Sequence, residues 1–205
     1  MNGTMNPRAL TLADISDLRA YERERIAERE HIVAVKALRR IHIGTIMSMV
    51  FENRDTMRFQ VQEMARAEKM ATDDQIQHEL DVYNKLIPRP GELSVTMFIE
   101  CTTDDQMKYW FPRLVGVERE LELRIGAPGP DQVVVRCTPE EDHEAQLTRE
   151  DITSAVHYVR FEVGSRHAHA FAAGPVELAC THPSYLESTQ LSPAVRATLV
   201  EDLRP

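Results

Sequence analysis

The stretch Phe51–Met70, FENRDTMRFQVQEMARAEKM, marks a predicted passage from a strand into a charged helix. Isoleucines and methionines dominate residues 41–51 just before it, most simply as a single strand. Asn53 is a preferred N-cap, and Asp55 falls in the first turn, where a negative charge meets the helix dipole favourably. Methionines and a valine at helical spacing then predict a helix from Arg54 to about Lys69.

This strand–helix corner is also the candidate ligand-binding site. Its polar residues are Glu52, Asn53, Arg54, Asp55, Arg58, Gln62 and Glu63. Arginine can donate two parallel hydrogen bonds to a carboxylate, and the free N–H groups of a helix N-terminus bind anions. The alternative is an internal network, with pairs such as Glu63–Arg66 at helical spacing, worth about 0.3–0.5 kcal/mol each when exposed. The sequence leaves both readings open.

Helical patterns continue on both sides of this corner. Residues 11–40 predict two charged helices that break near Tyr21, and Thr72 with Gln75 forms a capping box at the start of another helix. The NKLIPRPG stretch, residues 84–91, ends that helix because proline cannot continue it.

The second half alternates apolar and polar residues, as half-buried strands do. Such runs cover residues 93–101, 117–125, 133–137, 155–163 and 176–182, and the acidic stretch 138–151 predicts a loop. Ser192 and Pro193 begin a C-terminal helix. We therefore expect an α+β fold with a helical N-terminal half packed on a mainly antiparallel β-sheet. Its predicted parts are an N-terminal helical arm (1–40), an α+β core domain (41–185) and a C-terminal helical tail (186–205).

The net charge, the cysteines and the apolar runs of the chain bear on what it binds and where it is located. The chain has 205 residues and a formal net charge of -9, which argues against nucleic acid or an anionic membrane as the main partner. Three widely spaced cysteines without a CxxC pair argue against a zinc or iron–sulfur site held by this chain alone. No apolar run reaches 18 residues, so we expect a cytoplasmic protein.

Two histidines are candidate metal ligands. His157 and His182 both fall on the apolar faces of predicted strands. Together with Glu52, Glu63 or Glu162 they would suit iron or zinc, since imidazole and carboxylate are common ligands of both metals. The alternative is that both are hydrogen-bonded core histidines. No GxSxG, Walker or dinucleotide glycine pattern is present, so the catalytic residues are unknown.

Four segments together resemble a known family. FENRDTMRFQVQEMARAE, ELDVYNKLIP, SAVHYVRFE and THPSY are similar to the bacterial domain-of-unknown-function family 3501, over roughly Leu10 to Tyr185. The resemblance implies no assigned activity and no catalytic residues that could be carried over. It implies that members of the family are encoded near rubrerythrin-like proteins and near iron–sulfur, heterodisulfide-reductase-like proteins. Such neighbours imply a role in redox or peroxide metabolism.

These observations favour a cytoplasmic accessory protein that binds a small anionic ligand or a redox partner of the rubrerythrin or iron–sulfur type. The first alternative is a non-haem metal-dependent oxidoreductase with histidine and carboxylate ligands. The second is a structural subunit that docks a partner through its charged N-terminal helix. A homo-oligomer is also compatible with the sequence.

Overall fold

One antiparallel sheet organises the computed structural model, which describes residues 6–140 and 151–205. Its eight strands in these ranges follow the order β1-β2-β3-β6-β5-β4-β7-β8, and every neighbouring pair is antiparallel. The strands are β1 (Arg40–Ile43), β2 (Met47–Glu52), β3 (Glu92–Ile99), β4 (Leu121–Ile125), β5 (Val133–Pro139), β6 (Val156–Glu162), β7 (Val176–His182) and β8 (Tyr185–Gln190). The sheet curls into a nearly closed, barrel-like shape, so that its edge strands β1 and β8 approach one another.

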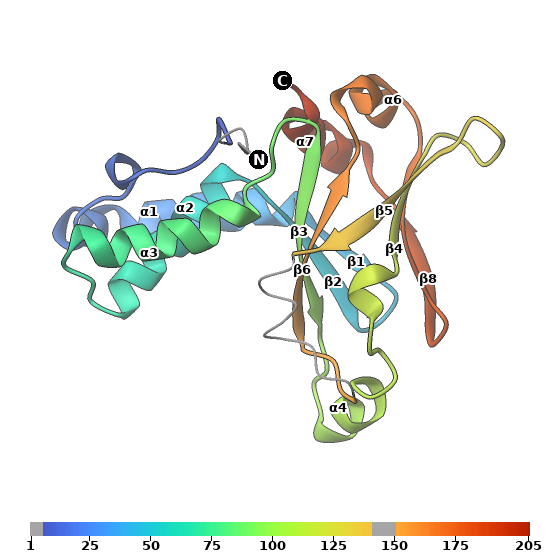
Figure 1. Ribbon diagram of the computed structural model, residues 1–205, viewed down its shortest axis with the longest axis horizontal. Helices are drawn as coiled ribbons and strands as arrows, with labels where there is room; N and C mark the ends of the chain where they lie inside the picture. The colour runs from blue at the N-terminus through green and yellow to red at the C-terminus, as the bar shows by residue number, and fades with distance from the viewer. Residues whose placement is uncertain (1–5, 141–150) are drawn as a thin grey trace, which may run out of the picture.

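Six α-helices in the described ranges surround this sheet (Figure 1). They are α1 (Leu18–Ala37), α2 (Arg54–Ala67), α3 (Asp73–Tyr83), α4 (Asp104–Trp110), α6 (Ala168–Ala173) and α7 (Pro193–Leu203). Short 3-10 turns are η1 (Leu12–Asp14), η2 (Asn84–Leu86), η3 (Val117–Arg119) and η4 (Ser165–His167). Helices α1, α2 and α3 form a lobe on one side of the sheet, while α4 lies at the opposite end from α6 and α7 (Figure 1).

The expected helical half packed on a sheet is therefore wrong. Strands β1, β2 and β3 come from the first hundred residues, and α6 and α7 come from the last forty, so helices and strands are interleaved along the chain. The antiparallel pairing follows the predicted pattern, but the expected two-layer arrangement does not form. The physical reason is that α1–α3 pack mainly on one another, which leaves the sheet to enclose its own core by curling.

Two separate apolar cores follow from this arrangement. The larger one lies inside the curled sheet, and α7 adds Leu199 and Leu203 to it. The smaller core, in the helical lobe, consists of Leu10, Met57, Val61, Leu80, Leu86 and Ile87. Tyr158 of β6 packs against this smaller core, so it marks where the lobe meets the outer face of the sheet.

Two local predictions fail for identifiable reasons. Residues 41–51 form a hairpin rather than one strand, because Gly44 takes a left-handed φ of +59° between β1 and β2. A Cβ on Gly44 would lie 2.3 Å from the hydroxyl of Tyr185, which donates to the carbonyl of Ile43 at 2.7 Å. The helix break near Tyr21 is also wrong, since α1 runs through that residue. The predicted loop 138–151 lies largely outside the described residues, and β5 extends to Pro139.

The C-terminal helix is anchored to the opposite end of the chain. Asp202 of α7 forms a buried ion pair with Arg39, which precedes β1. The carbonyl of Asp202 also accepts from Arg8 Nη1 at 2.8 Å and from the N–H of Gly91. The expected division into arm, core and tail stays a prediction. In the described part of the chain, every helix is too short or too polar to cross a membrane.

Candidate functional site

The predicted corner begins α2 as expected, with Asn53 as its N-cap. The Asn53 side chain accepts from the N–H of Thr56 at 2.9 Å, and the Thr56 hydroxyl accepts from the N–H of Asn53 at 2.9 Å. Asp55 is exposed in the first turn. Arg54 does not reach toward a ligand site, because its guanidinium donates to Asp14 of η1 at 2.6 Å.

Further along α2, charged side chains pair with α1. Glu63 accepts two hydrogen bonds from Arg25, at 2.7 and 2.8 Å, and a third from the hydroxyl of Tyr21 at 2.7 Å. The Arg25 guanidinium thereby lowers the pKa of Glu63 from its usual 4.5 to about 2. Arg58 donates to Glu28 at 2.7 Å. These residues hold α1 against α2.

Gln62 also joins α2 to the segment that precedes α1. It is fully buried, and its amide donates to the carbonyl of Ser16 at 3.0 Å while accepting from the N–H of Ser16 at 2.9 Å. We call this set of polar contacts between α2 and the preceding segment the α1–α2 seam; its members are Arg54–Asp14, Gln62–Ser16, Arg25–Glu63, Glu28–Arg58 and Glu22–Arg66. Most of the predicted ligand-binding residues thus have intramolecular partners, which come from outside α2.

Glu52 is the exception among the predicted site residues. It ends β2 and is 3% exposed. Its Oε1 accepts from the hydroxyl of Thr96 at 2.7 Å, but its Oε2 is buried without a hydrogen-bond partner. A buried carboxylate oxygen without a donor is costly, so the surroundings of Glu52 are the place to look for a ligand.

Strand register places Glu52 in a line of polar side chains on the outer face of the sheet. Glu52 pairs with Ser94 of β3, Ser94 with Arg160 of β6, and Arg160 with Thr138 of β5. Register partners point to the same face, so these four residues form what we call the polar row. Strand spacing puts Glu52 and Arg160 about 10 Å apart, with Ser94 between them.

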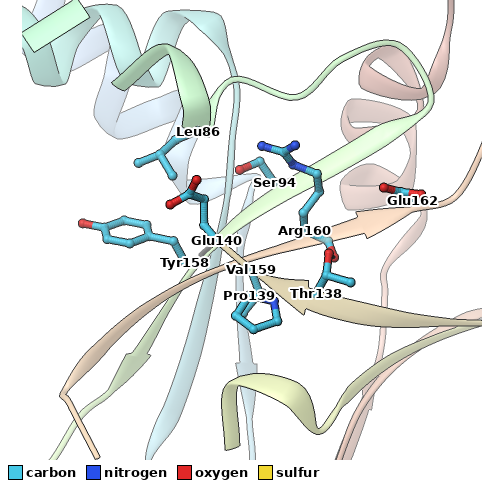
Figure 2. A pocket seen from close by; sticks show the side chains of 9 residues that line it. All are labelled: Leu86, Ser94, Thr138, Pro139, Glu140, Tyr158, Val159, Arg160 and Glu162. Carbon is cyan, nitrogen blue, oxygen red and sulfur yellow. The ribbon is translucent and has the colours of Figure 1, made fainter. Parts of the chain in front are cut away.

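A cleft opens over the polar row, between the sheet and the helical lobe (Figure 2). It encloses about 380 Å³ and is lined mainly by Leu86, Ser94, Thr138, Pro139, Glu140, Tyr158, Val159, Arg160 and Glu162. A second cavity of about 900 Å³ shares Glu140 and Arg160 with it and extends past η2 to the segment that precedes η1. Arg160 therefore faces both spaces.

Arg160 is held in place, but not all of its N–H donors form hydrogen bonds. Its Nη2 donates to the carbonyl of Lys85 at 2.5 Å, and its Nε is 3.6 Å from Glu92 Oε2, beyond hydrogen-bond distance. That Nε is buried and has no hydrogen-bond partner. In Figure 2 the guanidinium lies beside Ser94 at the wall of the cleft. The Nε faces Glu92, with which it forms an ion pair. A guanidinium at the wall of a partly enclosed cleft is suited to a carboxylate or phosphate.

Tyr158 adds a hydroxyl to the same cleft. Its ring packs on the lobe, and burial raises the pKa of its hydroxyl, with nearby Tyr83 and Glu52 acting in the same direction. The hydroxyl therefore stays protonated at neutral pH. Ser94 and Thr138 supply two further hydroxyls to the lining. The lining of the cleft thus combines hydroxyl groups with the guanidinium of Arg160.

Sequence reasoning did not find Arg160 and Tyr158 as site residues. Alternation along 155–163 correctly separates them from His157, but it does not show that the helical lobe half-buries their face of the strand. The SAVHYVRFE segment could have indicated these two site residues, because its tyrosine and arginine lie on the same face of the strand. Periodicity alone does not show that α2 and α3 return over that face.

The two predicted metal ligands lie apart from the cleft. His157 faces the inside of the sheet, opposite to Glu52; its Nε2 lies 2.8 Å from the Thr153 hydroxyl, and its Nδ1 lies 3.9 Å from Glu118. His182 Nδ1 accepts from the N–H of Ser184 at 3.2 Å. Within residues 6–140 and 151–205, no three His, Cys, Asp or Glu side chains group closely enough to hold a metal. Metal ligation by these histidines stays a prediction.

The cysteines do not supply a nucleophile. Cys137 and Cys180 are buried free thiols, and Cys101 is half-buried. Burial raises the pKa of Cys137 to about 12 and that of Cys180 to about 11. Both thiols are protonated at neutral pH, and a protonated thiol is a poor nucleophile.

Comparisons with known proteins agree with this picture of an uncharacterised family. No curated protein matches the chain. A solved structure, described as a novel protein of unknown function from Burkholderia pseudomallei K96243, matches with a TM-score of 0.85 and 35% sequence identity, covering 95% of this chain and 99% of that one. The model of the family "Protein of unknown function (DUF3501)" matches residues 9–203. The chain therefore belongs to the DUF3501 family.

Proposed function

We propose that this protein is a cytoplasmic accessory protein whose cleft binds a small anionic molecule that also carries hydrogen-bond donors. The observation that carries the proposal is Arg160, whose guanidinium is tethered to the carbonyl of Lys85 and lies at the wall of the cleft. The anionic group would bind Arg160, and the corner residues of α2 would position the lobe that forms one wall of the cleft.

The charges around the two connected cavities refine the ligand class. The basic residues are Lys85, Arg89 and Arg160, and the acidic ones are Asp81, Glu140 and Glu162. A purely anionic ligand would meet these carboxylates, so a carboxylic acid with an amino or hydroxyl group fits better than a simple anion. Such donors would face Glu140 and the hydroxyls of Ser94 and Thr138.

Thermal unfolding with defined probes tests the proposal. The probes are acetate, succinate, glycine and inorganic phosphate, each at millimolar concentration, with calorimetry on any that raises Tm. A ligand that binds only the folded state stabilises it in proportion to RT ln(1 + [L]/Kd). We expect glycine, which carries an amino group, to raise Tm more than acetate, succinate or phosphate does.

Variants of Arg160 assign the binding to the cleft. Arg160→Gln should abolish the Tm increase, and Arg160→Lys should retain part of it, since lysine keeps the charge without the bidentate geometry. The matched control is Arg113→Gln, because Arg113 stacks on Tyr109 of α4, away from the cleft. The proposal fails if no probe shifts the wild type, or if Arg160→Gln responds like wild type.

A redox partner of the rubrerythrin or iron–sulfur type remains part of the expectation for an accessory protein, and no contact described above bears on it. Co-purification from cells with the wild-type chain and with Arg160→Gln would test it. Loss of a captured iron protein with the variant would tie partner binding to the cleft.

A further inference from the structure

Helix α1 exposes an apolar patch on a side that α2 does not cover. Ile26 is 73% exposed and Val33 is 59% exposed, and each is followed directly by an exposed small residue, Ala27 or Ala34. The residues that α1 buries, Tyr21 and Ile32, lie roughly 100–140° around the helix from Ile26 and Val33. A helix normally directs its apolar stripe to a core, so branched apolar side chains in solvent mark an unfilled contact.

Two charges flank this patch and have no partner in the described part of the chain. Arg23 and Glu30 are exposed on the same outer face, and neither side chain forms an ion pair or hydrogen bond there. On a helix, partners would have to stand three or four residues away. For Arg23 those positions hold Arg19, Ala20, Ile26 and Ala27; for Glu30 they hold Ile26, Ala27, Val33 and Ala34. The helix itself therefore cannot neutralise either charge.

The inner face of the same helix shows the contrast. Glu22, Arg25 and Glu28 each have an oppositely charged partner on α2, at 2.7 Å in every case. Three charged side chains of α1 thus pair with α2. Arg23 and Glu30 lie on the exposed side of the helix, beyond the reach of α2, and stay without a partner in the described part of the chain.

The outer face is complementary to itself. The midpoint between Arg23 and Glu30 falls between Ile26 and Ala27, at the apolar patch. If a second α1 runs antiparallel about a twofold axis at this midpoint, each Arg23 meets Glu30 of the other copy, and the two Ile26 side chains meet at the axis. Ala27 lets the backbones approach. A parallel pair in register would instead place Arg23 against Arg23 and Glu30 against Glu30, which like-charge repulsion disfavours.

We propose that this face of α1 is a homodimer interface, in which two copies of the chain pair their α1 helices antiparallel about a twofold axis beside Ile26. Isologous contacts of this kind are the commonest in oligomers. A single helix pair buries less than the roughly 1,200 Å² of a stable interface. The dimer is therefore reversible, and its fraction rises with protein concentration.

Sedimentation velocity over a concentration series from micromolar to several hundred micromolar tests this on the full chain. Wild type should shift from monomer toward dimer, and Ile26→Glu should remain monomeric because it places two like charges at the axis. Arg23→Glu and Glu30→Arg should each weaken dimerisation by about tenfold or more, since each creates two like-charge contacts. Glu24→Arg, on the same helix but off this face, is the control and should dimerise as wild type does.

The decisive experiment mixes the two charge variants. An equimolar mixture of Arg23→Glu and Glu30→Arg chains brings opposite charges together at both contacts, so a mixed dimer should form at least as well as the wild-type dimer. Circular dichroism and Tm show that each variant is folded. A wild type that is monomeric throughout the series overturns the proposal, and so does a mixture that fails to restore dimers. A dimer unaffected by Ile26→Glu overturns it as well, because its interface would lie elsewhere.

Discussion

The α1–α2 seam and the polar row are both rich in polar residues, but they differ in how completely those residues find hydrogen-bond partners. In the seam, Glu63 accepts three hydrogen bonds, and Gln62 bonds both backbone groups of Ser16. In the row, Glu52 Oε2 and Arg160 Nε are buried without hydrogen-bond partners, whereas among the ten described residues of the seam this holds for Glu28 Oε2 alone. The difference teaches that density of charge does not identify a binding site; incomplete pairing in a partly enclosed place does.

The largest effect should come from Gln62→Leu in the seam. Leucine fills a similar volume but leaves the N–H and carbonyl of Ser16 without partners, and each unsatisfied backbone group costs about 1–3 kcal/mol. We expect a loss of about 2–3 kcal/mol in the free energy of unfolding, measured in urea. A change below the error of the measurement would mean that water replaces the amide, and that the seam is less closed than the contacts indicate.

Glu63→Gln should have the next largest effect, and it should depend on pH. The folded-state pKa of about 2 lies below the ordinary 4.5, so the stabilisation is present above pH 4.5 and is lost as the pH falls toward 2. Because the pair is about a quarter exposed, we expect about 1–2 kcal/mol at pH 7. Urea unfolding at pH 7 and at pH 3 should show the difference between wild type and variant shrinking at the lower pH.

Glu52→Gln in the polar row should behave in the opposite way. The Thr96 hydroxyl can still donate to the amide oxygen, while the variant removes a buried charge whose Oε2 has no donor. A neutral amide costs less to bury than a carboxylate, so we expect stability at pH 7 unchanged or raised by up to about 1 kcal/mol. Clear destabilisation would show that Glu52 is a structural residue like those of the seam.

Arg66→Ala should have the smallest effect. Arg66 pairs with Glu22 at 2.7 Å, but both side chains are more than a third exposed. Exposed ion pairs contribute about 0–1 kcal/mol, so the variant should lie within about 0.5 kcal/mol of wild type, and 0.5 M salt should reduce even that difference. An effect as large as that of Glu63→Gln would make the seam a cooperative network.

Local features of the fold were predictable from the sequence because they depend on neighbouring residues. The Asn53 cap, the Thr72 capping box and the β4–β5 hairpin all follow their patterns. The curling of the sheet was not predictable, since it depends on which strands become neighbours, such as β3 beside β6. Alternation also placed Glu118 in solvent, whereas it lies buried near His157.

The candidate site was predictable only in part for the same reason. The α2 corner drew attention because its residues are adjacent in sequence, yet most of them face α1. Arg160 and Ser94 become neighbours only through strand pairing, and the cleft exists only because the lobe returns over them. Glu52 belongs to both regions, since it ends the strand that precedes the corner and begins the polar row.

The buried pair between Arg39 and Asp202 has a consequence for biosynthesis. These residues are 163 positions apart in the chain, and Arg39 also donates to the carbonyl of Phe51 at 2.6 Å. On the ribosome, Arg39 is made early and has no carboxylate partner until α7 has been translated. The sheet likewise lacks β8 until late in synthesis. The native state is therefore reached only when translation of this region is nearly complete. Chains truncated before Asp202 should be bound by chaperones or degraded by proteases.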